Sequence, residues 1–113
     1  MAFLKPNNVV LQTVAQFYDI GVGRMLGRVS FKESVRAREV CTWILREYKQ
    51  LSYPHIGRLL HRDHSTIWTA YRRTKTRLRE DEQFRGEVEF IERLLGIGTT
   101  EATALTETKV TLQ

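Results

Sequence analysis

Cysteine, proline and long apolar runs are scarce in this chain of 113 residues, which has one cysteine, Cys41, and two prolines. A single cysteine excludes an internal disulfide and fits a reducing compartment. No apolar run approaches the ~20 residues that span a bilayer. The N-terminal residues MAFLKPNN lack the apolar stretch of a secretory signal. We therefore expect a cytoplasmic protein without a membrane anchor.

The sequence also lacks the motifs of several kinds of enzyme. It has no GxxxxGK[ST] loop, so we expect no nucleotide site. Asp63, His64 and Ser65 are the residue types of a hydrolase triad, but neighbours at a helix start diverge and form no proton relay. His55, His61 and His64 do not complete a metal site, because the one cysteine falls on an apolar stripe. We expect no enzyme activity, no metal and no cofactor.

Charge is distributed unevenly along the chain, whose net charge is +5. Residues 1–31 carry a net charge of +2, residues 32–79 of +8 and residues 80–113 of −5. A strongly basic middle segment favours a polyanionic partner such as nucleic acid. The alternative is a basic face that only keeps the protein in solution. The helix-turn-helix spacing described below favours nucleic acid.

Apolar residues recur at intervals of three and four in most of the chain, which predicts amphipathic helices. We expect an all-α domain of five or six helices over residues 9–96, with a flexible N-terminus at 1–8 and a flexible tail at 97–113. Asn7 or Asn8, Ser34, Ser52 and Asp63 are the expected N-caps, Gly27 is expected in the left-handed conformation, and Gly96 and Gly98 are expected to end the last helix. The expected helices cover residues 9–18, 20–26, 34–50, 52–60, 63–79 and 80–95.

Residues 52–79 have the pattern of a helix-turn-helix. Ser52 and Pro54 suit the start of a short helix, and Asp63 suits the N-cap of a second one about three residues after the first ends. In the second helix one stripe is suited to burial, consisting of Ile67, Ala70, Tyr71, Thr74 and Leu78. The opposite face is polar and basic, and the first turn, HST, has side chains of the type that read base edges in a major groove.

Four stretches resemble a known family. They are TVAQFYDI at residues 13–20, VRARE at 35–39, SYPHIG at 52–57 and RDHSTI at 62–67. They resemble the C-terminal DNA-binding domain (domain IV) of the bacterial replication initiator DnaA, over roughly residues 9–95. The resemblance implies a Trp-repressor-like helix-turn-helix that binds double-stranded DNA sequence-specifically and is nucleoid-associated. DnaA carries an ATPase module ahead of this domain, so we expect a free-standing DnaA-like protein without the ATP-driven step.

The resemblance and the helical spacing together select the candidate DNA contacts. The base-reading candidates are His64, Ser65, Thr66, Trp68 and Thr69. The phosphate or minor-groove candidates are Arg28, Arg36, Arg38, Lys49, Arg62, Arg72, Arg73 and Lys75. The side chain of Trp68 is expected to meet a thymine methyl or to shield the helix edge, and the sequence does not choose between them.

The sequence departs from the family at three places. The loop at residues 27–32 is less basic than the minor-groove loop of the family and offers Arg28 as its best candidate. Glu39 stands where the family usually has glutamine, so we expect it to turn away from DNA or to pair with an arginine. His61 stands where the family commonly has two glycines, which makes the turn one residue shorter. We therefore expect a different angle of the reading helix and a target sequence other than that of the family.

Several roles fit a protein of this kind. A transcriptional regulator, for instance of a phage or prophage, is one, and a protein that acts at replication-origin sites is another. A third, from a different class, is a protein-interaction module that uses the acidic last helix and tail. No heptad repeat or obvious exposed apolar stripe predicts an oligomeric state.

Overall fold

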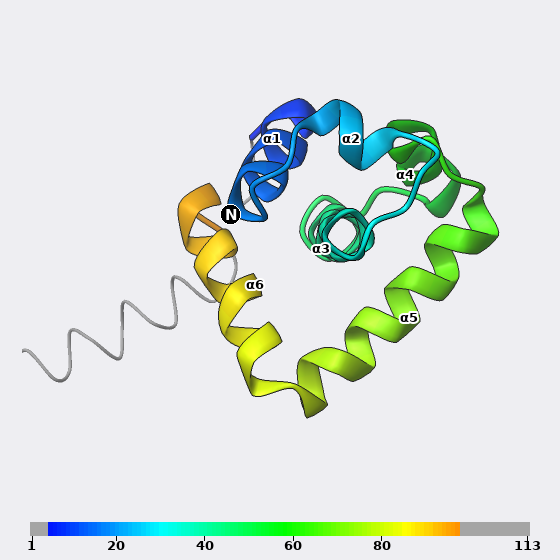
Figure 1. The fold of residues 1–113 in the computed structure, drawn as a ribbon. Coiled ribbons are helices and arrows are strands. Elements are labelled where there is room, and N and C mark those ends of the chain that lie inside the picture. The colour runs from blue at the N-terminus through cyan, green and yellow to red at the C-terminus, as the bar shows by residue number, and fades with distance from the viewer. Residues whose placement is uncertain (1–4, 98–113) are drawn as a thin grey trace, which may run out of the picture.

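A computed structural model of the chain describes residues 5–97, which form six helices and no strand (Figure 1). The all-α prediction is therefore confirmed. The helices are α1 (Asn7–Phe17), α2 (Val22–Leu26), α3 (Lys32–Glu47), α4 (Tyr53–Leu60), α5 (His64–Glu80) and α6 (Glu82–Leu95). Among the described residues, no helix combines the length and the hydrophobicity that crossing a membrane requires.

Helix α3 is the centre of the domain, and the other helices surround it (Figure 1). It contacts α1, α2, α4 and α5, while α6 packs against α1 and α5. Its apolar stripe is fully buried and consists of Ala37, Val40, Cys41, Ile44 and Leu45. Cys41 packs as a small apolar group, as expected, and burial raises the pKa of its thiol.

Helix starts in the first half of the chain differ from the predictions. Helix α1 begins at Asn7, with Pro6 at the N-cap, so neither asparagine caps it. Helix α3 begins at Lys32, with Phe31 at the N-cap, and Ser34 lies in its first turn. Ser34 is buried there, and its hydroxyl has no hydrogen-bond partner within the described residues. Gly27 has a φ of −72° and is not left-handed, since the chain leaves α2 in an extended conformation.

The caps in the second half agree better with the predictions. The side chain of Ser52 caps α4 by accepting from the backbone N–H of His55. Asp81 caps α6, so Glu80 completes α5 instead of opening the last helix. Gly96 ends α6 with a φ of 71°, as expected. Ile97 is buried in the core, one residue into the predicted tail. Residues 1–4 and 98–113, which include most of the predicted flexible ends, lie outside the described residues.

The last helix exposes more apolar surface than its sequence suggests. Phe84, Val88, Ile91 and Leu95 point into the core, as the spacing predicts. Phe90 and Leu94, which lie beside that stripe on the helix, are 44% and 54% exposed. Within the described chain, α6 thus has an outer apolar surface that α1 covers only in part.

Candidate nucleic-acid interface

The turn between α4 and α5 is held by backbone groups in close contact. The N–H of Arg62 donates to the carbonyl of Gly57 at 2.9 Å, and His61 ends α4 in the left-handed conformation. A Cβ on Gly57 would lie 2.4 Å from the carbonyl oxygen of Arg62. Real Cβ atoms do not come so close, so glycine is what allows this turn. This turn therefore fixes where α5 begins.

Asp63 organises the first turn of α5. Its carboxylate accepts from the backbone N–H of Ser65 at 3.0 Å and from the Ser65 hydroxyl at 2.5 Å. These bonds, the one from the hydroxyl foremost, lower the pKa of Asp63. The side chains of His64, Ser65 and Thr66 are exposed. Because the Ser65 hydroxyl donates to Asp63, its remaining lone pairs are available to accept a hydrogen bond from a ligand.

The rest of α5 has one buried and one exposed face. Ile67, Ala70 and Thr74 are buried, and Tyr71 stacks on Trp43 of α3 with ring centroids 5.4 Å apart. Burial, followed by the hydrogen bond to Glu47, raises the pKa of Tyr71 to about 12. The outward residues Thr69, Arg72, Lys75, Thr76 and Arg79 are exposed.

Trp68 belongs to the exposed face as well. It is 46% exposed, and the guanidinium of Arg72 lies 4.8 Å from its ring centroid. Contact with Arg72 leaves nearly half of the indole open, which favours a role at a surface over shielding of the core. The predicted pattern of inner and outer positions along α5 is confirmed.

Arg62 joins this turn to the loop at residues 27–31. Its guanidinium donates to the carbonyls of Gly27 at 2.6 Å, of Leu26 at 3.4 Å and of His61 at 3.0 Å. The predicted phosphate contact thus has a structural role, since its donors hold the loop against the start of α5. Arg28 and Val29 at the beginning of that loop are exposed. Arg28 makes no ion pair with any described residue, so its charge is available beside the helix-turn-helix.

Arg38, a predicted phosphate contact, points into the protein. Its side chain is buried, and its guanidinium donates to the carbonyl of Met25 at 2.7 Å and to the hydroxyl of Ser30 at 2.9 Å. Burial, followed by the proximity of Arg62, lowers its pKa. Two of the donors of Arg38 thus bind the end of α2 and the 27–31 loop from inside the protein.

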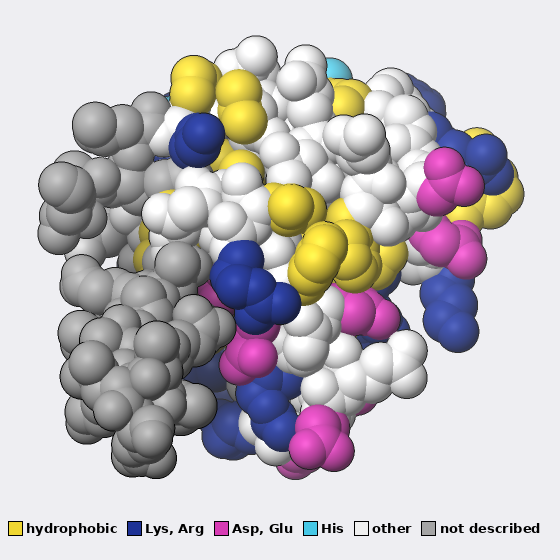
Figure 2. All heavy atoms as spheres, turned by 90° about the vertical axis from the view of Figure 1, so that its left-hand side faces the viewer, with side chains coloured by type: hydrophobic (Ala, Val, Ile, Leu, Met, Phe, Trp, Pro, Cys, Tyr) yellow, Lys and Arg dark blue, Asp and Glu magenta, His cyan; other side chains and the backbone are white. Residues whose placement is uncertain are grey.

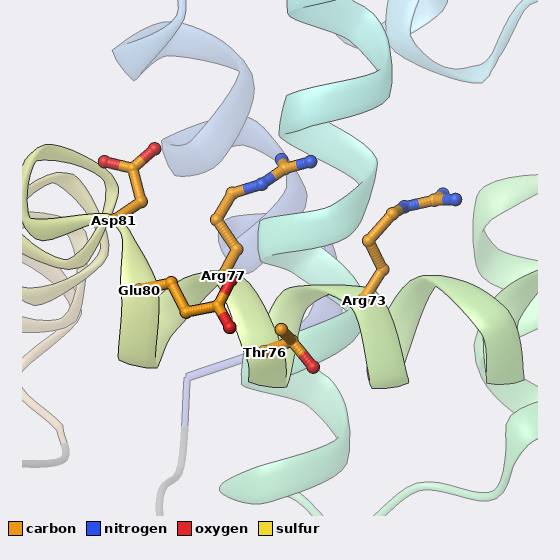
Figure 3. Close-up of a pocket in the computed structure, with 5 residues that line it drawn as sticks. All are labelled: Arg73, Thr76, Arg77, Glu80 and Asp81. Atoms are coloured by element: carbon orange, nitrogen blue, oxygen red, sulfur yellow. The ribbon is translucent and has the colours of Figure 1, made fainter.

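Glu39 pairs with arginines, one of the two outcomes expected from its sequence context. Its buried carboxylate, 3% exposed, accepts from Arg73 Nε at 2.8 Å and from Arg77 Nη1 at 2.7 Å. Figure 3 shows both arginines extending from α5 towards α3. They line a hollow of about 500 Å³. Thr76, Glu80 and Asp81 complete the lining of this hollow. These two ion pairs form a bridge from α5 to α3.

Two further residues that were predicted to contact DNA bind groups of the protein away from α5. Arg36 forms an ion pair with Glu87 of α6 at 3.6 Å and lies over the Phe84 ring. Lys49 donates to the carbonyl of Lys5 at 2.8 Å and to the side chain of Asn7 at 2.7 Å. Neither joins the exposed face of α5, so the structure does not bring all eight basic candidates together.

Three further arginines, which the sequence pattern did not single out, lie on or near the helix-turn-helix and the 27–31 loop. Arg58 is exposed on α4, and helical spacing alone would have placed it opposite the buried Ile56 and Leu60. Arg24 on α2 lies over the ring of Phe31, next to the 27–31 loop. The role of Arg77 had no local signal, because its partner Glu39 is distant in sequence.

Comparison with known proteins agrees with this arrangement. Residues 8–74 match the family model of the bacterial dnaA protein helix-turn-helix. The chain is 36% identical over 80 residues to the chromosomal replication initiator protein DnaA 1 of Chlamydia trachomatis, which covers 71% of this chain and 17% of that protein. It is 35% identical over 81 residues to DnaA of Thermomicrobium roseum, a match that covers 71% of this chain and 17% of that protein. It is 30% identical over 74 residues to DnaA of Mycoplasma pneumoniae, which covers 66% of this chain and 17% of that protein. The chain thus spans 17% of the length of these relatives. It belongs to the family of bacterial DnaA helix-turn-helix domains.

Proposed function

We propose that this DNA-binding domain recognises a specific double-stranded sequence by placing the first turns of α5 in the major groove. One observation carries the proposal: α5 has a buried apolar face and an opposite exposed face that is polar at its start and basic farther along. Membership of the DnaA family supports binding to DNA. A helix that enters a major groove needs such an unobstructed face, with short polar side chains at its N-terminal end.

The proposed base contacts lie in the first two turns of α5. His64, Ser65 and Thr66 meet base edges, with Ser65 acting as an acceptor because its proton is directed to Asp63. An acceptor at that point suits the amino group of cytosine or adenine. Trp68 and Thr69 follow, and the open part of the indole suits the methyl group of thymine.

The proposed phosphate contacts are the basic residues that the fold leaves exposed. They are Arg72 and Lys75 on α5 and Arg28 on the 27–31 loop, all exposed. A narrow minor groove attracts a guanidinium, which supports this role for Arg28. Arg73 shares its charge with Glu39 and contributes in part. Arg62 and Arg38 act indirectly, since their donors bind backbone and side-chain atoms of the protein. Arg24 and Arg58 join the set from α2 and α4.

We further propose that the domain acts at sites related to replication. Its relatives are named chromosomal replication initiator proteins, although it matches only 17% of their length. Regulation of transcription, in a phage or elsewhere, is the competing role. Mapping of occupied sites across a genome separates the two, because clusters at an origin support the first and promoters support the second.

The base-reading assignment predicts a specific loss in the double variant Ser65→Ala/Thr66→Ala. Each lost base contact is expected to cost roughly 1–3 kcal/mol and to relax the preference at one position of the site. The backbone cap on Asp63 survives because it uses the N–H of residue 65. Duplexes selected from a random pool by the unaltered protein provide the reference site. Thr76→Ala, on the same exposed face farther along α5, is the matched control, and an unchanged preference in the double variant would refute the assignment.

The phosphate assignment predicts a different signature. Arg72→Ala and Lys75→Ala are each expected to weaken binding to all duplexes alike and to reduce the slope of log affinity against log salt by about one unit. Lys49→Ala is the comparison, since its amino group binds the start of α1, and it should leave the slope unchanged. Titrations at several salt concentrations measure the slope. A loss at Lys49 as large as at Arg72 would show that the protein meets DNA with another face.

A further inference from the structure

We propose that the outer surface of α6 pairs with the same surface of a second copy of this chain, with the two helices antiparallel. The α6 surface is defined here as Gln83, Gly86, Phe90, Arg93 and Leu94. These positions follow the three- and four-residue spacing of one helix face and lie away from the core stripe of α6. The proposal concerns the side of the molecule that carries α1 and α6 (Figure 2).

The first reason is the apolar surface at its centre. Phe90 and Leu94 are about half exposed and one helical turn apart. Phe17 of α1 lies beside Phe90, with ring centroids 5.6 Å apart, so the patch extends over two helices. Figure 2 shows hydrophobic side chains reaching the surface on this side, with basic and acidic side chains next to them. An apolar patch with a polar rim is typical of an interface.

The second reason is a glycine that the monomer does not need. Gly86 lies in the middle of α6, one turn before Phe90, and a Cβ at this position would have no atom within 4 Å. Glycine is among the poorest helix formers, and neither tight packing nor a left-handed φ explains it here. Its missing side chain leaves a gap on the surface directly beside an exposed aromatic ring.

The two features fit each other when a second copy is considered. A two-fold axis between positions 86 and 90 of antiparallel helices places each Phe90 over the Gly86 of the second copy. The same register brings the exposed Arg93 opposite Gln83 and next to the exposed Glu82 of the second copy. The surface is thus complementary to itself in both shape and charge. This self-complementarity singles out a second copy as the occupant.

The position of the surface determines what the pair would do. In Figure 1 α6 lies on the side of the domain opposite the start of α5. Two copies joined through α6 therefore direct their helix-turn-helix turns away from each other. This consequence rests on the proposed function: the pair bridges two separate duplex segments instead of binding adjacent half-sites.

Self-association without DNA tests the pairing. Because one helix per copy forms a small interface, the association is expected to be weak and is measured by sedimentation equilibrium of the full chain up to about millimolar concentration. Gly86→Gln fills the gap with a good helix former, so it should weaken association by roughly tenfold or more while the melting temperature stays the same or rises. Phe90→Ser, which removes the apolar centre of the surface, should weaken association as well. Gly23→Ala, at another glycine with open space around it, is the control.

Charge reversal tests the antiparallel register. Arg93→Glu is expected to weaken association, and adding Glu82→Arg to the same chain is expected to restore it. A chain that remains monomeric at every concentration, or a Gly86→Gln variant that associates unchanged, overturns the proposal. If the double reversal fails to restore association, the antiparallel register is wrong. Pairing through another face would give the same result.

The bridging step has its own readout. Capture of a labelled duplex by an immobilised one should require the unaltered α6 surface, whereas Gly86→Gln should keep its affinity for a single duplex and lose capture. Association in solution without capture overturns the opposed orientation. Failure of all variants to bind any duplex would refute the proposed function and leave the pairing result standing.

Discussion

Gly57→Ala is expected to destabilise the domain by about 1–3 kcal/mol, the usual cost of overpacking, and to weaken specific DNA binding by tenfold or more. The added methyl group would lie 2.4 Å from the Arg62 carbonyl oxygen and 3.6 Å from the backbone nitrogen of His64. Both neighbours are backbone atoms, so the turn itself has to move. That movement displaces the start of α5, where the proposed base contacts lie. Urea unfolding and titration with the selected duplex measure the two effects.

Gly21→Ala is the matched control for this substitution. Gly21 precedes α2, and a Cβ there would have no atom within 4 Å. The control should keep its stability within about 0.5 kcal/mol and bind normally. If Gly57→Ala retains both stability and affinity, the turn tolerates a wider angle and the close contact does not position α5. Under conditions where the variant stays folded, the specific complex should weaken more than the nonspecific one.

The double variant Arg73→Ala/Arg77→Ala is expected to lose about 3–5 kcal/mol of unfolding free energy. The reason lies in Glu39, whose buried carboxylate would lose both of its cationic partners. A loss of this size is a large part of the 5–15 kcal/mol that typically stabilises a domain. Chemical unfolding measures it directly.

A third substitution separates the bridge from other effects of the arginines. Adding Glu39→Gln to the double variant removes the uncompensated charge and should recover a substantial part of the lost stability. Arg72→Ala/Arg79→Ala removes the same number of charges from exposed positions of the same helix and should cost no more than about 1 kcal/mol. An equal loss with and without the charge on Glu39 would mean that the arginines stabilise α5 independently of α3.

Features that depend on a few neighbouring residues were predictable from the sequence. The caps Ser52 and Asp63, the end of α6 at Gly96 and the two faces of α5 follow from short patterns. Caps and turns are formed by groups within a few residues of each other, so the sequence alone specifies them. The start of α3 was missed because Ser34, a good cap by residue type, turns inward instead.

Roles that depend on the tertiary structure were not predictable. Arg38 has the residue type and setting of a surface contact, and only the fold of the 27–31 loop over it shows that it is buried. Arg62 was selected for its charge, whereas its observed partners are the carbonyls of a loop distant in sequence. Phe90 lies beside the apolar stripe of α6 and is 44% exposed. The apolar residues of α6 form a surface wider than its neighbouring helices cover. The sequence does not specify which part of that surface they cover.

The bonds of Arg62 to the 27–31 loop bear on how this domain changes during evolution. They end on the backbone oxygens of Leu26 and Gly27, which every amino acid supplies. Substitutions at exposed Val29 would therefore change the surface of the loop without changing its distance from α5. In the proposed binding mode, a single mutation in this loop would change the contacts in one groove while α5 keeps its position in the other.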